Sequence, residues 1–321
     1  MRTSYILTLI LALMLIISAH GTASAATITG YEAVFLPYRV ADSQVRFAIR
    51  SFKRDGRTAY LVLDPYAFET SVVDGPLDFE KPPVKKDWEA TPFIKALYRY
   101  TAPHDGIANQ GVISAEGFRD GVFVTADMCP SGRSFEKAFF ERTADLGSAG
   151  KPAPIAVMIT GLWIERHDKE FRWLIAQQKK GRLDITWVNH SYTHPYKEDL
   201  LLDKNFLLMQ GVEFETEVLS TEVLLLQNGL IPSPFFRYPG LISNADLQKR
   251  LAALTLIPIG ANAWLAKGEA PVPGSIVLVH GNGNEPVGIK AVLTFFDDKK
   301  AEIKSGSLKL MGLKDAFGKG R

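Results

Sequence analysis

The chain has 321 residues, of which 46% are hydrophobic and 22% are charged, and its formal net charge is +2 at pH 7. This composition is typical of a globular protein with room for one large domain or two smaller ones, and it excludes a disordered or repetitive chain. The 37 basic and 35 acidic residues nearly balance, and no basic block or stripe stands out, which excludes a nucleic-acid partner.

The first 25 residues have the layout of a cleavable secretory signal. Arg2 precedes an apolar stretch from Tyr5 to Ile17, and the small residues Ala23-Ser24-Ala25 follow. Because this stretch is short for a spanning helix, we expect residues 1–25 to be removed and no stable membrane span to remain; an uncleaved anchor is the alternative. The mature protein is therefore predicted to be exported, either periplasmic or extracellular. There its single cysteine, Cys129, has no partner for an internal disulfide.

Residues 26–118 are predicted to form a β-rich N-terminal segment. The strand-like runs 45–52 and 58–63 flank a loop at 53–57 that is typical of a hairpin. Residues 75–92 contain four prolines among mixed charges, so an irregular connection is expected there. We expect this segment to carry no chemistry.

From residue 119 to about residue 300 the pattern becomes strand, loop and helix, repeated several times. This order predicts parallel strands covered by crossover helices, an α/β fold. The expected strands are 122–126, 155–159, 184–188, 235–238, 256–259 and 276–279. The expected helices are 168–180, a longer one at 205–227, and one that begins after the capping residues 243–246. Residues 301–321 are expected to be a C-terminal tail.

Polar side chains follow the carboxyl ends of the expected strands, which is the edge where parallel α/β folds build their sites. They are Asp127, His190 with His194, Arg237, Asn262 with Trp264, and His280. The pattern predicts one functional site at this edge of the sheet.

His190 and His194 have the spacing of a metal-binding pair. On one helical turn, side chains four positions apart lie on the same face about 6 Å from each other, whereas on a straight strand they stand roughly 13 Å apart. The run 189–195 is therefore predicted to curl after its strand and to bind a divalent metal, with zinc favoured; Pro195 ends the turn. The alternative is a pair of ordinary loop histidines.

The motifs in this order resemble those of the polysaccharide deacetylases with the NodB-homology domain, a group of metal-dependent carbohydrate esterases. The resemblance covers about residues 118 to 297. The matching segments are Thr125-Ala126-Asp127-Met128-Cys129-Pro130, His190 to His194, Phe236-Arg237-Tyr238-Pro239-Gly240, and Val277-Leu278-Val279-His280. The resemblance implies an irregular (β/α)7-type barrel that removes N-acetyl groups from a polysaccharide or cell-wall glycan of the N-acetylglucosamine type.

The resemblance also implies roles for individual residues. Asp127 corresponds to the general base that activates water, and His280 to the general acid that protonates the leaving amine. Arg237 orients Asp127 and holds it ionised. Trp264 is expected either to stack against a sugar ring or to be simple core. The implied substrate-binding residues are Tyr238, Pro239, Gly240 and Trp264, and the implied metal ligands are His190 and His194.

Two positions depart from the family pattern. Met128 stands where the family carries a second aspartate, the third protein ligand of the metal, and a thioether is a poor ligand for zinc. Asn262 stands where an aspartate often supports the arginine. Three explanations remain open: Asp127 is the third ligand, the Cys129 thiolate is, or the site is degenerate and the protein only binds carbohydrate. A further reading is that the substrate is an O-acetyl ester or a small amide.

Overall fold

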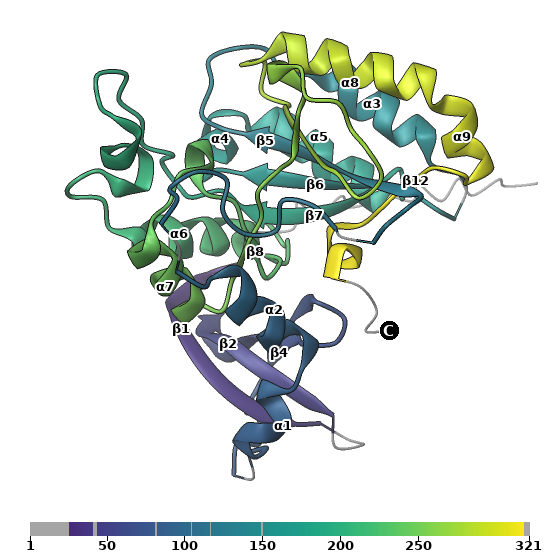
Figure 1. Cartoon of the computed structure of the whole chain (residues 1–321). Coiled ribbons are helices and arrows are strands. Elements are labelled where there is room, and N and C mark those ends of the chain that lie inside the picture. The colour runs from purple at the N-terminus through teal and green to yellow at the C-terminus, as the bar shows by residue number, and fades with distance from the viewer. Residues whose placement is uncertain are drawn as a thin grey trace, which may run out of the picture.

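The structure, a computed structural model, describes residues 26–40, 44–80, 82–103, 105–115, 117–148 and 150–317. The predicted secretory signal lies outside these described residues. None of the described helices combines the length and the apolar character needed to cross a membrane. A small antiparallel sheet lies at one end of the molecule, below a larger parallel sheet (Figure 1).

The antiparallel sheet confirms the predicted β-rich character of the N-terminal segment. Its strands, in the spatial order of the sequence, are β1 (Ile28–Arg39), β2 (Val45–Arg54), β3 (Arg57–Asp64) and β4 (Glu69–Asp74). Asp55 and Gly56 form the turn between β2 and β3, with φ angles of 50° and 80°. An Asp-Gly pair favours this left-handed backbone, which suits the twist of a tight hairpin, so the turn is shorter than the expected loop 53–57.

The connection after the sheet contains two helices, which corrects the prediction of an irregular segment over 75–92. They are α1 (Lys85–Glu89) and α2 (Pro92–Tyr100). Pro92 begins a helix rather than breaking one, because its missing N–H would have no partner in the first turn and its fixed φ suits a helix. Phe93, Ile94 and Leu97 of α2 are buried in the same hydrophobic cluster as the antiparallel sheet.

The parallel sheet confirms the predicted fold class, an irregular (β/α)7-type barrel that opens on one side. Its strand order is β10-β11-β5-β6-β7-β8-β9. The strands are β5 (Gly121–Met128), β6 (Ala153–Ile159), β7 (Leu183–Asn189), β8 (Phe235–Phe236), β9 (Ile257–Pro258), β10 (Ala263–Trp264) and β11 (Ile276–His280). The helices that accompany them are α3 (Lys137–Leu146), α4 (Gly161–Arg166), α5 (Asp168–Lys179), α6 (Phe214–Gln227), α7 (Ala245–Ala253) and α8 (Pro286–Asp298).

Side chains of β5 alternate between two environments. Val124, Ala126 and Met128 are buried in a cluster with residues of α3 and α8, the helices above the sheet in Figure 1. Thr125 and Asp127 lie on the opposite face, inside the barrel, because successive strand residues point to opposite sides. The barrel interior therefore receives every second residue of this strand.

The segment 112–115 closes part of the gap between β9 and β11. The Val112 N–H donates to the carbonyl of Pro258 (2.9 Å), and the Ala115 N–H donates to that of Gly274 (2.8 Å). Gly111 has a φ of 97°, and a Cβ there would lie 2.1 Å from the Pro258 oxygen, so only glycine fits this crossing. The chain that follows the N-terminal helices thus forms part of the barrel wall.

The helix expected over 205–227 is shorter than predicted. It begins at Phe214, and two 3-10 turns, Leu202–Lys204 and Phe206–Leu208, precede it. Asn205 is buried, and its side-chain carbonyl accepts from Lys197 N (3.0 Å) and Phe206 N (2.8 Å), which competes with helix formation. Gly211, with a φ of 84°, separates this loop from α6.

The segment expected to be a C-terminal tail is part of the fold as far as residue 317. It contains α9 (Lys300–Ser305) and β12 (Lys309–Leu310), which pairs in parallel with β5. The ring of Phe317 stacks on Phe68 at 4.4 Å and on Phe235 at 5.4 Å between centroids. Phe317 therefore packs between the antiparallel sheet and the barrel.

A buried ion pair also joins the antiparallel sheet to helix α6 of the barrel. Arg50 of β2 is fully buried, and its Nε and Nη2 donate to the carboxylate of Glu222 on α6 at 2.7 and 2.9 Å. Its Nη1 donates to the carbonyls of Ile49 and Leu254 at 2.7 and 2.8 Å. The Tyr31 hydroxyl donates to Glu222 at 2.8 Å, so both charges have several partners.

Candidate metal and catalytic site

A cavity of about 650 Å³ opens at the carboxyl ends of the parallel strands. Among the predicted site residues, it is lined by Asp127, His190, His194, Gly240, Trp264 and His280. Further lining residues include Cys129, Tyr196, Phe206, Leu241 and Glu285. The structure therefore brings most of the predicted site together at the predicted edge.

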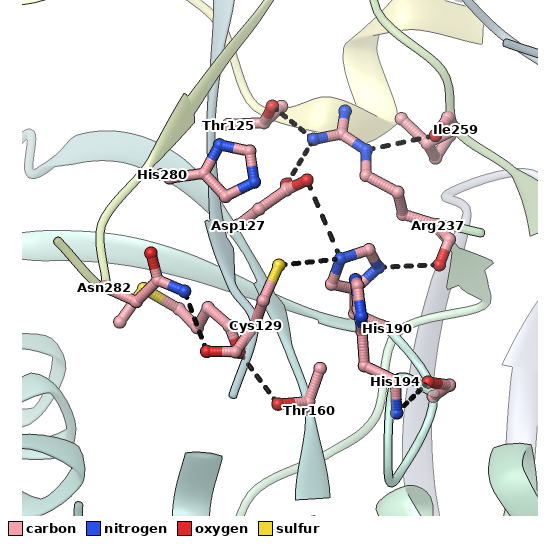
Figure 2. Close-up of polar contacts among 12 residues, drawn as sticks. Thr125, Asp127, Cys129, Thr160, His190, His194, Arg237, Ile259, His280 and Asn282 are labelled. Carbon is pink, nitrogen blue, oxygen red and sulfur yellow. Dashed lines mark hydrogen bonds and ion pairs between the residues drawn. The ribbon is translucent and has the colours of Figure 1, made fainter. Parts of the chain in front are cut away.

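Asp127 lines the cavity, and the fully buried Arg237 contacts it (Figure 2). Arg237 Nη1 donates to Asp127 Oδ1 at 2.6 Å and to the Thr125 hydroxyl at 2.8 Å. The rest of the guanidinium donates to the carbonyls of Ile259 (3.2 Å) and Gly260 (2.8 Å). With its donors fixed on several sides, Arg237 holds the Asp127 carboxylate in one orientation, as a bidentate or forked guanidinium does.

The histidine run curls as predicted, although the turn is not helical. Ser191 and His194 have φ angles of 69° and 48°, and the rings of His190 and His194 lie 4.9 Å apart between centroids. The side chain of Asn189 accepts from Ser191 N (3.0 Å), and the Ser191 hydroxyl accepts from His194 N (3.1 Å). These local hydrogen bonds replace helical ones and bring both imidazoles to the cavity.

His190 is held in one ring orientation. Its Nδ1 lies 2.8 Å from the carbonyl oxygen of Arg237, so this nitrogen carries the proton and donates it. Its Nε2 faces Cys129 Sγ at 3.5 Å and Asp127 Oδ2 at 3.7 Å. An imidazole whose Nδ1 is bound to a carbonyl presents a free Nε2 lone pair, which is the arrangement of metal-binding histidines.

Glu217 of α6 fixes the turn between His190 and His194 through hydrogen bonds. Its carboxylate accepts from the backbone N–H groups of Tyr192 (2.9 Å) and Thr193 (2.8 Å), and from the Thr193 hydroxyl (2.6 Å). The carboxylate therefore satisfies the exposed donors of a backbone that no helix supports. Sequence analysis did not identify this residue, because a glutamate inside a helical segment carries no motif.

We expect Glu217→Ala to weaken zinc binding by about 10- to 100-fold, the usual effect of removing a partner that supports metal ligands. The reason is that the turn carrying His194 loses the acceptor for its backbone. Competition with a chromogenic chelator measures the affinity. Glu215→Ala is the matched control on the same helix, because Glu215 pairs with Arg250 and not with the turn. Equal affinities in both variants would contradict this role.

Cys129, which directly follows β5, completes a cluster with the histidines. One potential ligand atom from each of Cys129, His190 and His194 lies within 4.8 Å of the other two. Burial alone raises the pKa of the Cys129 thiol, but the neighbouring imidazoles outweigh it, and the pKa lies well below its ordinary value. The pKa of His194 is raised, because the charge of Cys129 outweighs the burial that lowers it.

This cluster fits a divalent metal. Two imidazole nitrogens and a thiolate are donors that zinc accepts, and three protein ligands leave a coordination position open for water or substrate. The predicted metal ligands His190 and His194 are both in the cluster. Asp127, one of the open choices for the third ligand, does not belong to it.

His280 lies beside Asp127, since the two are register partners on the neighbouring strands β11 and β5. Its Nδ1 donates to Glu285 Oε2 at 2.7 Å, and the same oxygen accepts from Trp264 Nε1 at 2.8 Å. Burial lowers the pKa of His280, but Cys129, Glu285 and Asp127 together raise it to about 11. Glu285 is a second residue that the sequence did not reveal; its only signal is its place five residues after the histidine.

Three residues that the sequence placed at the site do not line the cavity. Tyr238 is buried, and its hydroxyl donates to the carbonyl of Leu247 (3.0 Å), so this side chain belongs to the core rather than to the cavity. Pro239 is buried and is not part of the cavity wall. Asn262 is exposed and accepts from Ile276 N (3.1 Å), and backbone carbonyls hold Arg237 instead.

Trp264 and Gly240 lie on the cavity wall. Lys267 Nζ lies 3.6 Å from the centroid of the Trp264 ring, so a cation is placed over the indole. Gly240, with a φ of 62°, approaches Phe206 so closely that a Cβ would lie 2.3 Å from the ring. Both residues shape the cavity next to the histidine turn.

Residues 29–82 match a family model described as the RP012 protein N-terminal domain. Among solved structures, a family 4 carbohydrate esterase from Bacillus anthracis has a TM-score of 0.47 at 16% identity, over 71% of this chain and 92% of that chain. A chitin deacetylase from the fungus Colletotrichum lindemuthianum has a TM-score of 0.41 at 18% identity, over 66% and 92%. A CE4 family pseudoenzyme from Bacillus anthracis has a TM-score of 0.44 at 13% identity, over 70% and 82%.

Proposed function

We propose that this chain is an exported, metal-dependent hydrolase that removes N-acetyl groups from a glycan of the N-acetylglucosamine type. One observation carries the proposal: a single cavity contains a candidate metal cluster, an arginine-bound aspartate and a histidine on the neighbouring strand. Export rests on the pattern of residues 1–25, and zinc is the favoured ion because of the donor set.

Amide hydrolysis needs each of these parts. An amide is a poor electrophile with a poor leaving group, so water must lose a proton while the departing nitrogen gains one. When bound by Cys129, His190 and His194, a divalent ion supplies polarisation of the acetyl carbonyl and lowers the pKa of water. Asp127 accepts the proton of the attacking water, and Arg237 keeps its carboxylate in place.

His280 completes the reaction from the neighbouring strand β11. Its Nδ1 is tied to Glu285, so its Nε2 is the nitrogen that carries the transferable proton. As the C–N bond breaks, this proton passes to the amide nitrogen, and the products are acetate and a free amine on the sugar. The register between β5 and β11 holds the base and the acid side by side.

The alternative function is glycan binding without catalysis. The sequence favours this alternative at two positions, Met128 and Asn262, where the related family carries carboxylates. Met128 is fully buried in the core on the outer face of β5, and Asn262 is exposed away from Arg237. Neither side chain lines the cavity, so the missing carboxylates leave the cavity residues unchanged. The geometry therefore favours hydrolysis.

Acetate release tests the proposal directly. The purified protein, supplied with zinc, is expected to liberate acetate and free amine from N-acetylated chito-oligosaccharides or from cell-wall glycan. Release from O-acetyl esters alone would replace the proposed substrate by an ester. Glycan binding with no acetate from any of these substrates would contradict the proposal and support the non-catalytic alternative.

A further inference from the structure

Three side chains at the end of β5 come into question as metal ligands, and two of them line the cavity. Met128 lies on the outer face, where a Cβ added at Gly281 would meet its sulfur at 2.8 Å. Asp127 faces the cavity, and Cys129, two positions further along, also lines the cavity. The position that departs from the family pattern in sequence is therefore not the position that reaches the site.

The distances around Cys129 suit metal coordination. In a tetrahedral zinc site, a sulfur about 2.3 Å from the ion and a nitrogen about 2.05 Å from it lie roughly 3.5 Å apart. Cys129 Sγ and His190 Nε2 are 3.5 Å apart. A ring nitrogen of His194 lies within 4.8 Å of both atoms, so a small movement of its ring would bring all three ligands to one ion.

One carboxylate oxygen of Asp127 is already bound to Arg237. Its Oδ1 accepts from Arg237 Nη1 at 2.6 Å, and the guanidinium itself is fully buried. Asp127 Oδ2 lies 3.7 Å from His190 Nε2, but Asp127 is not part of the cluster of Cys129, His190 and His194, whose potential ligand atoms all lie within 4.8 Å of one another. The arginine thus keeps Asp127 beside the histidines rather than among the ligands.

We infer that Cys129 is the third protein ligand, and that this sulfur–nitrogen–nitrogen site selects zinc or another thiophilic divalent ion over magnesium, calcium and manganese. Thiolate and imidazole prefer such borderline ions, whereas a carboxylate ligand would also suit harder ones. The role of the ion in turnover rests on the proposed function, but its ligation by Cys129 is a separate property of the chain.

X-ray absorption on the zinc-loaded wild-type protein gives the first test. We expect one sulfur scatterer at about 2.3 Å together with imidazole scattering. The cobalt-substituted protein should show a thiolate-to-cobalt charge-transfer band in the near ultraviolet. Both readouts use the intact protein, so they do not depend on whether a variant folds. Nitrogen and oxygen scattering alone would overturn the inference, as would the absence of any bound zinc.

Variants then separate the two candidate ligands. Cys129→Ser should lose the cobalt band and weaken zinc binding at least ~10-fold, whereas Asp127→Asn should keep both the band and stoichiometric zinc. Cys129→Asp should bind metal without the band and gain affinity for manganese. Zinc retained by Cys129→Ser but lost by Asp127→Asn would overturn the inference. A zinc–sulfur site in a protein that releases no acetate would refute the proposed function and leave this inference intact.

Discussion

His280→Ala is expected to lower kcat for acetate release from an N-acetylated glycan by about 10²- to 10⁴-fold, the usual contribution of a general acid. The amine leaves as a strong base unless it receives a proton, and His280 is the cavity histidine outside the metal cluster. Because its ring does not belong to that cluster, the variant should retain stoichiometric zinc. Steady-state rates and metal analysis of the same preparation check both parts.

An activated aryl acetate provides the matched control for His280→Ala. Its leaving group departs without protonation, so the loss of the acid should affect its hydrolysis far less than that of the amide. Glu285→Gln should give a smaller loss on the amide with an unchanged KM, because Glu285 positions His280 through one hydrogen bond. An equal fall on both substrates would assign His280 to another role.

Arg50→Met should destabilise the protein by about 3–5 kcal/mol, because it leaves the Glu222 carboxylate buried without its main partner. Glu222 has a side-chain exposure of 1% and receives two hydrogen bonds from the guanidinium. Urea unfolding followed by circular dichroism measures the change as a lower midpoint. The loss should be large because the pair lies between the antiparallel sheet and the barrel.

Two controls define the origin of this effect. The double variant Arg50→Met with Glu222→Leu should regain most of the stability, since replacing both charges by apolar groups leaves no unpaired ion. Arg172→Ala removes an exposed pair with Asp168 and should change stability by about 1 kcal/mol at most. If Arg50→Met lowers stability no more than Arg172→Ala does, the buried pair contributes little.

The long strands of the barrel and the places of the short strands β8 and β9 could be predicted from sequence, whereas β10 could not. β5, β6 and β7 are apolar runs bounded by polar or glycine residues, a pattern that depends only on local burial. β10 is two residues long, and its place in the sheet depends on β11 rather than on its own composition. The early start expected for α6 was wrong because the buried side chain of Asn205 organises a loop there.

The candidate site shows the same division. Asp127 and His280 lie at the carboxyl ends of β5 and β11, and the histidine pair lies in the turn after β7, so their position at one edge follows from the parallel order of the sheet. Tyr238 was assigned to the substrate site because it adjoins Arg237 in sequence, but side chains of adjacent residues point in different directions. The same limit left the third ligand open, with Asp127 favoured over Cys129, since only the folded backbone shows which atoms converge.

The strand-like crossing at 112–115 bears on how this protein can be divided. A domain boundary at residue 118 would assign the two sheets to separate domains. Cutting the chain there would, however, remove residues 112–115, whose N–H groups donate to the carbonyls of Pro258 and Gly274. The excised barrel would expose unpaired backbone along that seam, an edge open to association with other chains. An engineered chimera that keeps residues 105–115 with the barrel therefore preserves a wall that a conventional domain swap would open.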